Sequence, residues 1–352
     1  MTVVTPTLVG DLLHTRMVTP TKRAKSLEET TMRARTLLVS ALALTAIVGT
    51  IAPATAATTK KKATKKTVAK TATTAAPTTA APATTAAPAT TAAPAATATT
   101  DGGATLDAIK KRGKIVIGTK WDVPLIGLKN PVSGDVQGYD VEIGKIIAKE
   151  IFGTDKGKVE WVEAISANRI PFITDAKVDI ILSTFSITDA RKQQVDFAGP
   201  YYVAGQDLLI YKIDADAIKN VTDLNGRKVC AQTGSTSVTN LKTLAPRASV
   251  LDLPTTANCV EALKDGRVDA VSTDDTLLAG FAEKFPAFSL VGKQFSVEKY
   301  GVGLKKGDTA FRNYLNDIIE KSFKDGSWKK AVESTIGTGG LKTPDAPKVE
   351  RY

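Results

Sequence analysis

Short apolar runs alternate with amphipathic stretches from about residue 104 towards the C-terminus. Compact runs bounded by turn residues predict strands, and apolar residues about three or four positions apart predict helices. Ile143, Ile147 and Ile151 have this helical spacing. The pattern predicts strands at 114–118, 159–162, 179–182, 208–211, 228–231, 249–253, 269–272 and 289–291, and helices at 170–175, 236–244, 257–265, 276–285 and 308–325.

Strands and helices that alternate in this way predict an α/β fold in which helices cover both faces of a sheet. The alternation forms two series within roughly 245 residues, so we expect two lobes. Hydrophobic residues make up 43% of the chain and charged residues 24%. That balance supports a packed core and excludes a wholly disordered chain.

Residues 32–57 have the pattern of a secretory signal peptide. Two arginines precede an apolar run over 37–51, and Ala54-Thr55-Ala56 provides a small-residue cleavage site. The run is shorter than the ~20 residues that a membrane-spanning helix prefers, so an uncleaved anchor is the weaker interpretation. Because no Cys lies near the cleavage site, we expect an exported protein without a lipid anchor there.

The segments on either side of the signal differ from a globular sequence. Signal peptides begin at the N-terminus, so we expect translation to start at Met32 or Met17, with residues 1–31 as an extension. Residues 58–103 are mainly Thr, Ala, Pro and Lys, and Thr-Thr-Ala-Ala-Pro-Ala recurs three times over 78–95. This composition predicts a disordered linker. Two alternatives to a plain spacer are that the lysines of this segment contact an anionic envelope polymer and that its threonines carry sugars.

The net charge of +11 at pH 7 first suggests an acidic macromolecular partner. Its distribution changes that interpretation. Residues 1–103 contain 12 Lys and Arg against 4 Asp and Glu, whereas the remaining residues contain 35 against 32. The folded part therefore carries a net charge of only +3, which argues against a nucleic-acid partner.

The chain has two cysteines and one histidine. In an exported protein, Cys230 and Cys259 favour a disulfide. Two cysteines without a histidine leave a zinc shell incomplete, and a catalytic thiol would lack its base, so we expect no metal and no cofactor. The single histidine, His14, lies in the N-terminal extension and supplies no chemistry to the mature protein.

Five motifs follow one another along the folded part. They are Gly138-Tyr-Asp-Val-Glu-Ile143, Asn168-Arg-Ile-Pro-Phe172 with Lys177-Val-Asp-Ile180, Ser186-Ile-Thr-Asp-Ala-Arg191 with Val195–Tyr202, Gly234-Ser-Thr236, and Val268-Asp-Ala-Val-Ser-Thr-Asp-Asp275. Together they resemble the family 3 extracellular solute-binding proteins, the polar amino-acid receptors of ABC importers. The resemblance covers essentially 104–340. Ser166–Pro171, the two cysteines and Asp274–Gly280 are most similar to actinobacterial glutamate-binding proteins.

The resemblance implies a type II periplasmic-binding-protein fold. Two α/β lobes, each a sheet flanked by helices, are joined by two crossover strands, and the ligand is held in the cleft between them. The implied boundaries are 104–206 plus 303–345 for lobe 1, 207–302 for lobe 2 and 346–352 for a C-terminal tail.

An amino acid carries a carboxylate and an ammonium, so a selective site needs a cation and an anion at a fixed separation. Arg191 suits the carboxylate because its planar guanidinium donates two parallel hydrogen bonds. The resemblance implies that Ser186 supports Arg191 and that Thr184 faces the ammonium. Without it, the simpler interpretation is that Arg191 covers a helix surface and Ser186 caps that helix.

The second lobe supplies the remaining α-group candidates. Ser235 and Thr236 follow a strand and begin a predicted helix, where backbone N–H groups attract anions. The resemblance assigns them to the ligand carboxylate, although an ordinary helix cap has the same pattern. It assigns Asp274 to the ammonium, and the neighbouring Asp275 is the alternative.

A second carboxylate on the ligand would need a second cation, since an unpaired buried charge costs several kcal/mol. Arg169 with Ser166 matches the position that has this role in the glutamate/aspartate receptors, and Lys120 is close enough in the implied fold to assist. This sequence has Lys120 and Thr256 where those receptors have Arg and His. The expected ligand is therefore glutamate, with aspartate or glutamine next.

The resemblance, together with these residues, implies a monomeric, non-enzymatic receptor that captures an acidic or polar amino acid and delivers it to an ABC permease. No G-x-x-x-x-G-K-[ST] loop occurs in the sequence, so the ATPase is a separate subunit. One alternative is an enzyme on the same scaffold, resembling periplasmic arogenate or prephenate dehydratases. A wall-attached amino-acid sensor is another.

Overall fold

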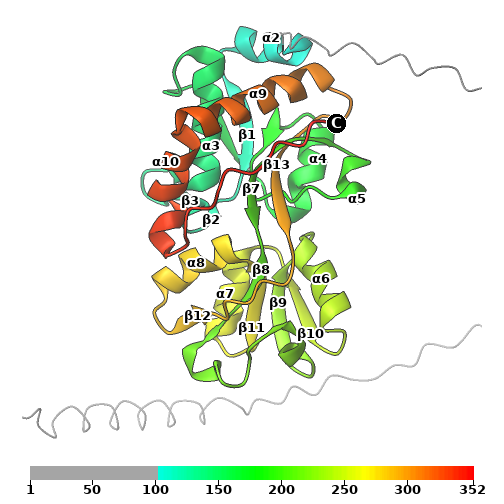
Figure 1. Ribbon diagram of the computed structural model, residues 1–352, viewed down its shortest axis with the longest axis vertical. Helices are drawn as coiled ribbons and strands as arrows, with labels where there is room; N and C mark the ends of the chain where they lie inside the picture. The colour runs from blue at the N-terminus through cyan, green and yellow to red at the C-terminus, as the bar shows by residue number, and fades with distance from the viewer. Residues whose placement is uncertain (1–101) are drawn as a thin grey trace, which may run out of the picture. The chain divides into compact units, whose positions relative to one another are not determined.

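Two five-stranded sheets, each flanked by helices, organise residues 102–352, the part of the chain that this computed structural model describes (Figure 1). The expected N-terminal extension, the signal peptide and nearly all of the linker lie outside the described residues. Within those residues, no helix combines the length and apolar content needed to cross a bilayer.

Lobe 1 is built on a sheet with strand order β5-β1-β6-β13-β7. β1 runs parallel to β5 and β6, whereas β13 runs antiparallel to β6 and β7. Its elements are α2 (Gly103–Arg112), β1 (Ile115–Thr119), the small sheet β2 (Asp122–Val123), β3 (Gly127–Lys129) and β4 (Val136–Gln137), α3 (Tyr139–Phe152), β5 (Val159–Glu163), α4 (Arg169–Thr174), β6 (Ile180–Ile181), α5 (Asp189–Lys192), β7 (Asp196–Ala204), β13 (Glu298–Leu304), α9 (Thr309–Asp325) and α10 (Ser327–Ser334).

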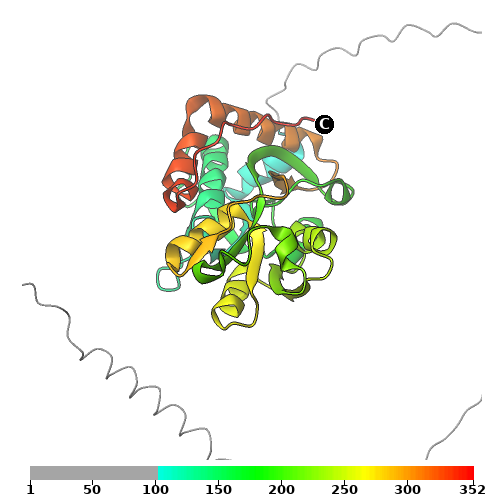
Figure 2. The same ribbon diagram turned by 60° about the horizontal axis from the view of Figure 1, so that its bottom comes forward.

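Lobe 2 is built on a sheet with strand order β10-β9-β11-β8-β12. β9, β10 and β11 are parallel, and β8 runs antiparallel to β11 and β12. Its helices lie on both sides of the sheet (Figures 1 and 2). Its elements are β8 (Gln206–Tyr211), β9 (Lys228–Gln232), α6 (Thr236–Leu244), β10 (Ser249–Leu253), α7 (Thr256–Lys264), β11 (Ala270–Asp274), α8 (Asp275–Lys284) and β12 (Phe288–Leu290).

Apolar side chains cover both faces of each sheet. One continuous cluster joins the α3, α9 and α10 side of lobe 1 to the α7 and α8 side of lobe 2. The opposite faces have separate clusters, one under α6 in lobe 2 and one under α4 in lobe 1. The two-sided burial explains why the strands read as continuous apolar runs in the sequence.

The strands and helices predicted from the apolar pattern are confirmed to within a few residues, but the pattern misses α2, α10 and the short strands β2, β3 and β4. It also misses β7 and β13. These two strands connect the lobes. β7 contains Pro200, which is tolerated because β7 is an edge strand. In β13, a Cβ at Gly301 would lie 2.9 Å from the Phe197 ring and one at Gly303 would lie 2.8 Å from the Phe185 ring. Close packing therefore requires residues that are untypical of strands.

The boundary between the lobes differs from the expected one. Glu298 pairs with Ala204 at the start of β13, so this whole strand belongs to the sheet of lobe 1. The expected boundary at 302/303 falls inside the strand. The crossings between lobes lie at Gly205, between β7 and β8, and just before Glu298.

The expected C-terminal tail, 346–352, lies along the edge of β7 (Figure 1). The Glu350 N–H donates to the Gly199 carbonyl at 2.8 Å, and the Phe197 N–H donates to the Tyr352 hydroxyl at 2.8 Å. Val349 is buried. The tail thus covers an otherwise unpaired strand edge.

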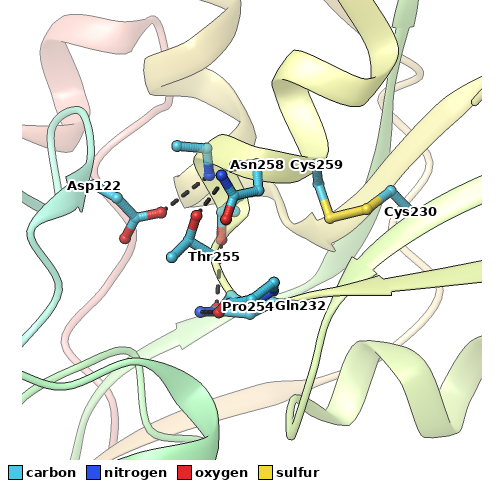
Figure 3. The surroundings of a disulfide bond; sticks show 9 residues. Asp122, Cys230, Gln232, Pro254, Thr255, Asn258 and Cys259 are labelled. Carbon is cyan, nitrogen blue, oxygen red and sulfur yellow. Dashed lines mark hydrogen bonds between the residues drawn. A yellow bond between two sulfur atoms is a disulfide. The ribbon is translucent and has the colours of Figure 1, made fainter. Parts of the chain in front are cut away.

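The predicted disulfide forms between Cys230 on β9 and Cys259 on α7 (Figure 3). Both cysteines are fully buried. The bond fixes the first turns of α7 to the strand that leads into the space between the lobes.

Candidate ligand-binding site

A small polar cavity lies between the lobes, where loops follow the carboxyl ends of β1, β6, β9 and β11. Open α/β sheets place ligands at this edge because the loops after parallel strands converge there. Eight of the nine expected ligand residues line the cavity. The lining residues are Lys120, Ser166, Arg169, Thr184, Ser186, Gln232, Ser235, Thr236, Ser237, Thr273, Asp274 and Leu277.

The ninth expected residue, Arg191, connects loops of both lobes beside this cavity. α5 begins after Thr188, whose hydroxyl accepts a hydrogen bond from the Arg191 N–H at 3.3 Å. The guanidinium Nη1 donates to the Ser186 carbonyl at 2.7 Å, and Nη2 donates to the Gly234 carbonyl of lobe 2 at 3.3 Å. Burial lowers the pKa of Arg191, but a guanidinium remains charged at neutral pH.

Arg169 is buried at the start of α4, and most of its donors bond to backbone carbonyls. Nε donates to Ser166 at 3.3 Å, and Nη1 donates to both Ser183 and Thr184 at 3.0 Å. Nη2 lies 3.5 Å from the Gly234 carbonyl. Arg169 therefore orders the loops around the cavity and contributes charge, rather than presenting a free two-pronged face.

Both guanidiniums contact the ring of Phe185. The guanidinium carbon lies 4.5 Å from the ring centroid for Arg169 and 5.0 Å for Arg191, which are cation–π distances. Burial and repulsion from Arg191 lower the pKa of Arg169 well below its usual range. Among residues 102–352, no carboxylate lies within 4 Å of either guanidinium or of the Lys120 ammonium. The cavity thus collects positive charge without pairing it directly.

Asp274, rather than Asp275, faces the cavity. Tyr300 of β13 donates its hydroxyl to Asp274 Oδ2 at 2.6 Å, across the lobe interface. Burial, followed by repulsion from Glu298, raises the pKa of Asp274 to about 7. Asp275 instead accepts hydrogen bonds from Gln294 at 2.6 Å and from Thr276 at 2.7 Å. Asp275 is therefore engaged in local structure near the crossing.

Gln232 is a cavity residue that the sequence interpretation missed. Its Oε1 accepts hydrogen bonds from Lys120 Nζ at 2.8 Å and from Ser166 Oγ at 2.9 Å, both across the cleft. Thr256 Oγ1 is a weaker third donor at 3.4 Å. Burial lowers the pKa of Lys120 to about 8, so this ammonium remains largely charged at pH 7. A strand-end Gln two residues before Gly234 was the only signal in the sequence.

The start of α6 presents Ser235 and Thr236 to the cavity. Ser235 is the N-cap, yet its hydroxyl is buried and has no hydrogen-bond partner among the described residues. Thr236 donates its hydroxyl to Glu298 at 2.9 Å. A buried hydroxyl without a partner costs free energy, which a bound polar ligand would recover. A Cβ at Gly234 would lie 2.9 Å from the backbone of lobe 1, so this position needs glycine.

Asp140, from the first turn of α3, holds the loop that carries Thr184. Thr184 has a φ of +43°, an uncommon conformation for a β-branched residue. Its N–H donates to Asp140 Oδ2 at 2.8 Å, and the Tyr201 hydroxyl donates to Oδ1 at 2.7 Å. Burial raises the pKa of Asp140 to about 6, so it is mostly ionised at pH 7. The Gly138-Tyr-Asp140 motif therefore does not line the cavity, but Asp140 holds in place the loop that places Thr184 there.

Comparison with known sequences places these residues in a family. The profile of the bacterial extracellular solute-binding proteins, family 3, matches residues 115–338, which contain the whole cavity. The chain belongs to this family. The resemblance expected from the five motifs is thereby confirmed.

Relatives of this family 3 protein include amino-acid receptors. It is 42% identical over 233 residues to the ABC transporter glutamine-binding protein of Bacillus subtilis, covering 66% of this chain and 84% of that protein. It is 36% identical over 237 residues to the glutamate-binding protein of Corynebacterium efficiens, covering 64% and 80%. The protein is an amino-acid solute-binding protein of the ABC importer type.

Solved structures confirm the type II periplasmic-binding-protein fold. The cysteine-binding protein of Campylobacter jejuni superimposes with a TM-score of 0.65 at 31% identity, covering 70% of this chain and 99% of that one. An ancestral amino-acid-binding protein, described as a precursor of cyclohexadienyl dehydratase, gives 0.60 at 35% identity, covering 66% and 99%. Family 3 proteins are transport receptors and not enzymes, although their fold is shared with dehydratases.

Proposed function

We propose that the protein is an exported receptor that captures a polar amino acid between its lobes and delivers it to an ABC permease with a separate ATPase. The observation that carries this proposal is that Lys120 and Arg169 line one cavity with Asp274, that Arg191 lies beside it, and that none of the three cations has a carboxylate within 4 Å. An amino-acid zwitterion can place its carboxylate near these cations and its ammonium near Asp274. Contacts with both lobes are made only in the closed form, and this difference supplies the free energy of closure.

The α-groups of the ligand are assigned to separate sides of the cavity. Arg191, Ser186 and the N-terminus of α6 at Ser235 and Thr236 are proposed to bind the α-carboxylate. The partnerless Ser235 hydroxyl supports this assignment. Asp274 is proposed to bind the α-ammonium. For Thr184, only the hydroxyl is proposed to assist, because its carbonyl already accepts a hydrogen bond from Arg169.

The ligand side chain is proposed to meet Lys120, Ser166 and Gln232. Four carboxylates, Asp122, Asp140, Asp274 and Glu298, act on the three buried cations from beyond 4 Å. The cations therefore do not outnumber the carboxylates that act on them. A ligand with a neutral side chain adds no charge to this group, whereas an acidic one adds an unpaired negative charge at a cost of several kcal/mol. We therefore propose glutamine first and glutamate second, which reverses the order expected from sequence. The donors around Lys120 favour an oxygen-bearing side chain in either case.

Calorimetric titration tests this assignment. The purified protein is unfolded, dialysed and refolded to remove bound ligand, and is then titrated with each of the twenty amino acids. We expect micromolar or tighter binding of glutamine, weaker binding of glutamate, and no heat from apolar amino acids. Absence of binding to all twenty would refute the receptor function, and tighter glutamate binding would refute the charge argument.

An enzymatic role on the same fold remains the competing proposal, and the similarity to the dehydratase precursor is the observation in its favour. Dehydration of prephenate needs an acid positioned over the substrate ring. In the cavity, the cations bond to backbone carbonyls and to Gln232, an arrangement suited to binding. Incubation with prephenate or arogenate should therefore leave the substrate unchanged, and turnover would overturn the receptor proposal.

A further inference from the structure

The two lobes also touch at a place outside the cavity. The turn of lobe 1 over residues 122–124 meets α7 and α8 of lobe 2. Asp122, Pro124, Ala257 and Gly280, which make the contacts described next, do not line the cavity. Asp122 Oδ2 accepts a hydrogen bond from the Ala257 N–H at 3.0 Å (Figure 3). A Cβ built at Gly280 of α8 would lie 2.4 Å from the Pro124 carbonyl oxygen. The lobes thus meet almost backbone to backbone.

The Asp122 contact is a helix cap supplied by the opposite lobe. Ala257 lies in the first turn of α7, where N–H groups have no partner within the helix. Thr255 caps the next such group by accepting from the Asn258 N–H at 3.1 Å. A carboxylate at this end of a helix is favourable because the N-terminus is partially positive. When the lobes separate, the Asp122 carboxylate and the Ala257 N–H both lose this partner.

The disulfide holds the donor end of this contact, the first turn of α7, in place. Cys259 lies two residues after Ala257, and Cys230 lies on β9, so the first turn of α7 is tied to the sheet of lobe 2 (Figure 3). A contact between pre-ordered groups loses less conformational entropy when it forms. Asp122 therefore accepts from a donor N–H that does not need to be ordered on closure.

We propose that Asp122 and Gly280 form a ligand-independent latch that sets how much of the ligand-free protein is closed, and through it the affinity for every ligand. This proposal rests on the proposed receptor function. Apparent affinity scales with the fraction of molecules in the binding-competent form. A change in the latch should therefore weaken all ligands by the same factor, whereas a change in the cavity should alter their ratio.

Gly280→Ala tests the latch without changing a charge. Alanine favours a helix over glycine, so α8 should be at least as stable as before. In the closed form, however, the new Cβ meets the Pro124 carbonyl. We expect an unchanged or higher Tm of the ligand-free protein, with glutamine and glutamate weakened by one common factor of about tenfold or more. Wild-type affinity, or a loss of affinity that follows a lower Tm, would overturn the latch.

Asp122 variants test the capping contact. Asp122→Ala should weaken both ligands by about tenfold and Asp122→Asn by less, since Asn retains an acceptor oxygen. Asp252→Ala, at an exposed carboxylate on β10, is the matched control and should have no effect. Asp122 also raises the pKa of Lys120, so a change in the charge of Lys120 is a second explanation for weaker binding by the Asp122 variants. The Asp122→Ala/Gly280→Ala double variant separates them, because losses in one latch are less than additive and independent losses are fully additive.

Lobe separation in the ligand-free protein distinguishes failure of the latch from failure of the receptor function. Fluorescence resonance energy transfer between one dye on each lobe should report a smaller closed fraction for both variants than for the wild type. If no amino acid binds, the receptor function fails, and the dye distances still test the latch. If the protein binds but its lobe distances and affinities are unchanged in the variants, the latch is wrong and the receptor function stands.

Discussion

Removing one hydroxyl group should shift the pH dependence of ligand binding. Tyr300 donates its hydroxyl to the buried Asp274 carboxylate at 2.6 Å, and this hydrogen bond lowers the pKa of Asp274 against the effect of burial. Asp274 must be ionised to bind an ammonium. Because its pKa is about 7 in the free protein, affinity should rise with pH through 7 and fall by about tenfold per pH unit well below it.

The magnitude follows from the strength of a hydrogen bond to a charged group, about 1.5–3 kcal/mol. Since 1.36 kcal/mol corresponds to one pKa unit, Tyr300→Phe should raise the pKa of Asp274 by about one to two. At pH 7 the ionised fraction then falls from about one half to about a tenth or less, and affinity weakens by about 5- to 50-fold. The pH midpoint of binding should move upwards by the same one to two units.

Calorimetric dissociation constants for glutamine between pH 6.5 and 8 measure this shift. Asp140 has a pKa of about 6 and changes its ionisation mainly below this window, whereas Lys120, with a pKa of about 8, changes at its upper end in the wild type and the variants alike. Tyr202→Phe is the matched control, because Tyr202 contacts the Tyr300 ring but makes no hydrogen bond to Asp274. Affinity that is independent of pH in the wild type, or an equal shift in the control, would show that Asp274 does not receive the ammonium.

Three further changes probe other parts of the molecule. Arg191→Ala should weaken every amino acid by at least about a hundredfold in calorimetry, because a buried carboxylate loses its two-pronged partner; retained micromolar affinity would contradict its role. Gln232→Leu should increase the preference for glutamate over glutamine, because Lys120 loses the acceptor that now occupies it; an unchanged ratio of dissociation constants would refute this. Replacing Cys230 and Cys259 by Ser should lower the free energy of unfolding by about 3–4 kcal/mol in denaturant titration, as expected for a loop of 29 residues; an unchanged stability would contradict the loop-closure argument.

Residue type and motif predict some of the residues around the cavity but not others. Arg191, Asp274 and Ser235 could be named as candidate ligand residues from sequence, because an amino acid demands those chemical groups and because the family resemblance assigns roles to their motifs. Gln232 could not, since a single uncharged residue at a strand end has no distinguishing pattern. It becomes a site residue only when closure brings Lys120 and Ser166 of the other lobe to its amide oxygen.

The sequence also does not show which charged residues make structural contacts and which face the cavity. Asp275 and Asp274 are adjacent and chemically identical, and only the direction of the chain at the end of β11 sends one to the cavity and the other towards Gln294. Arg169 was expected to bind a ligand side chain, but its donors are largely taken by backbone carbonyls.

The α/β class, most strands and helices, the disulfide and the family can be predicted from the amino-acid sequence, because they depend on local periodicity, on two cysteines and on motifs read in order. The crossing strands β7 and β13 can be recognised only in the folded protein. The Pro residue in β7 is explained by the edge position of that strand, and the Gly residues in β13 by close packing against Phe185 and Phe197. The tertiary structure also decided the contacts between lobes, including Asp122 with α7. Residues far apart in the chain acquire a joint function only when folding brings them within hydrogen-bond distance, and no local pattern encodes that distance.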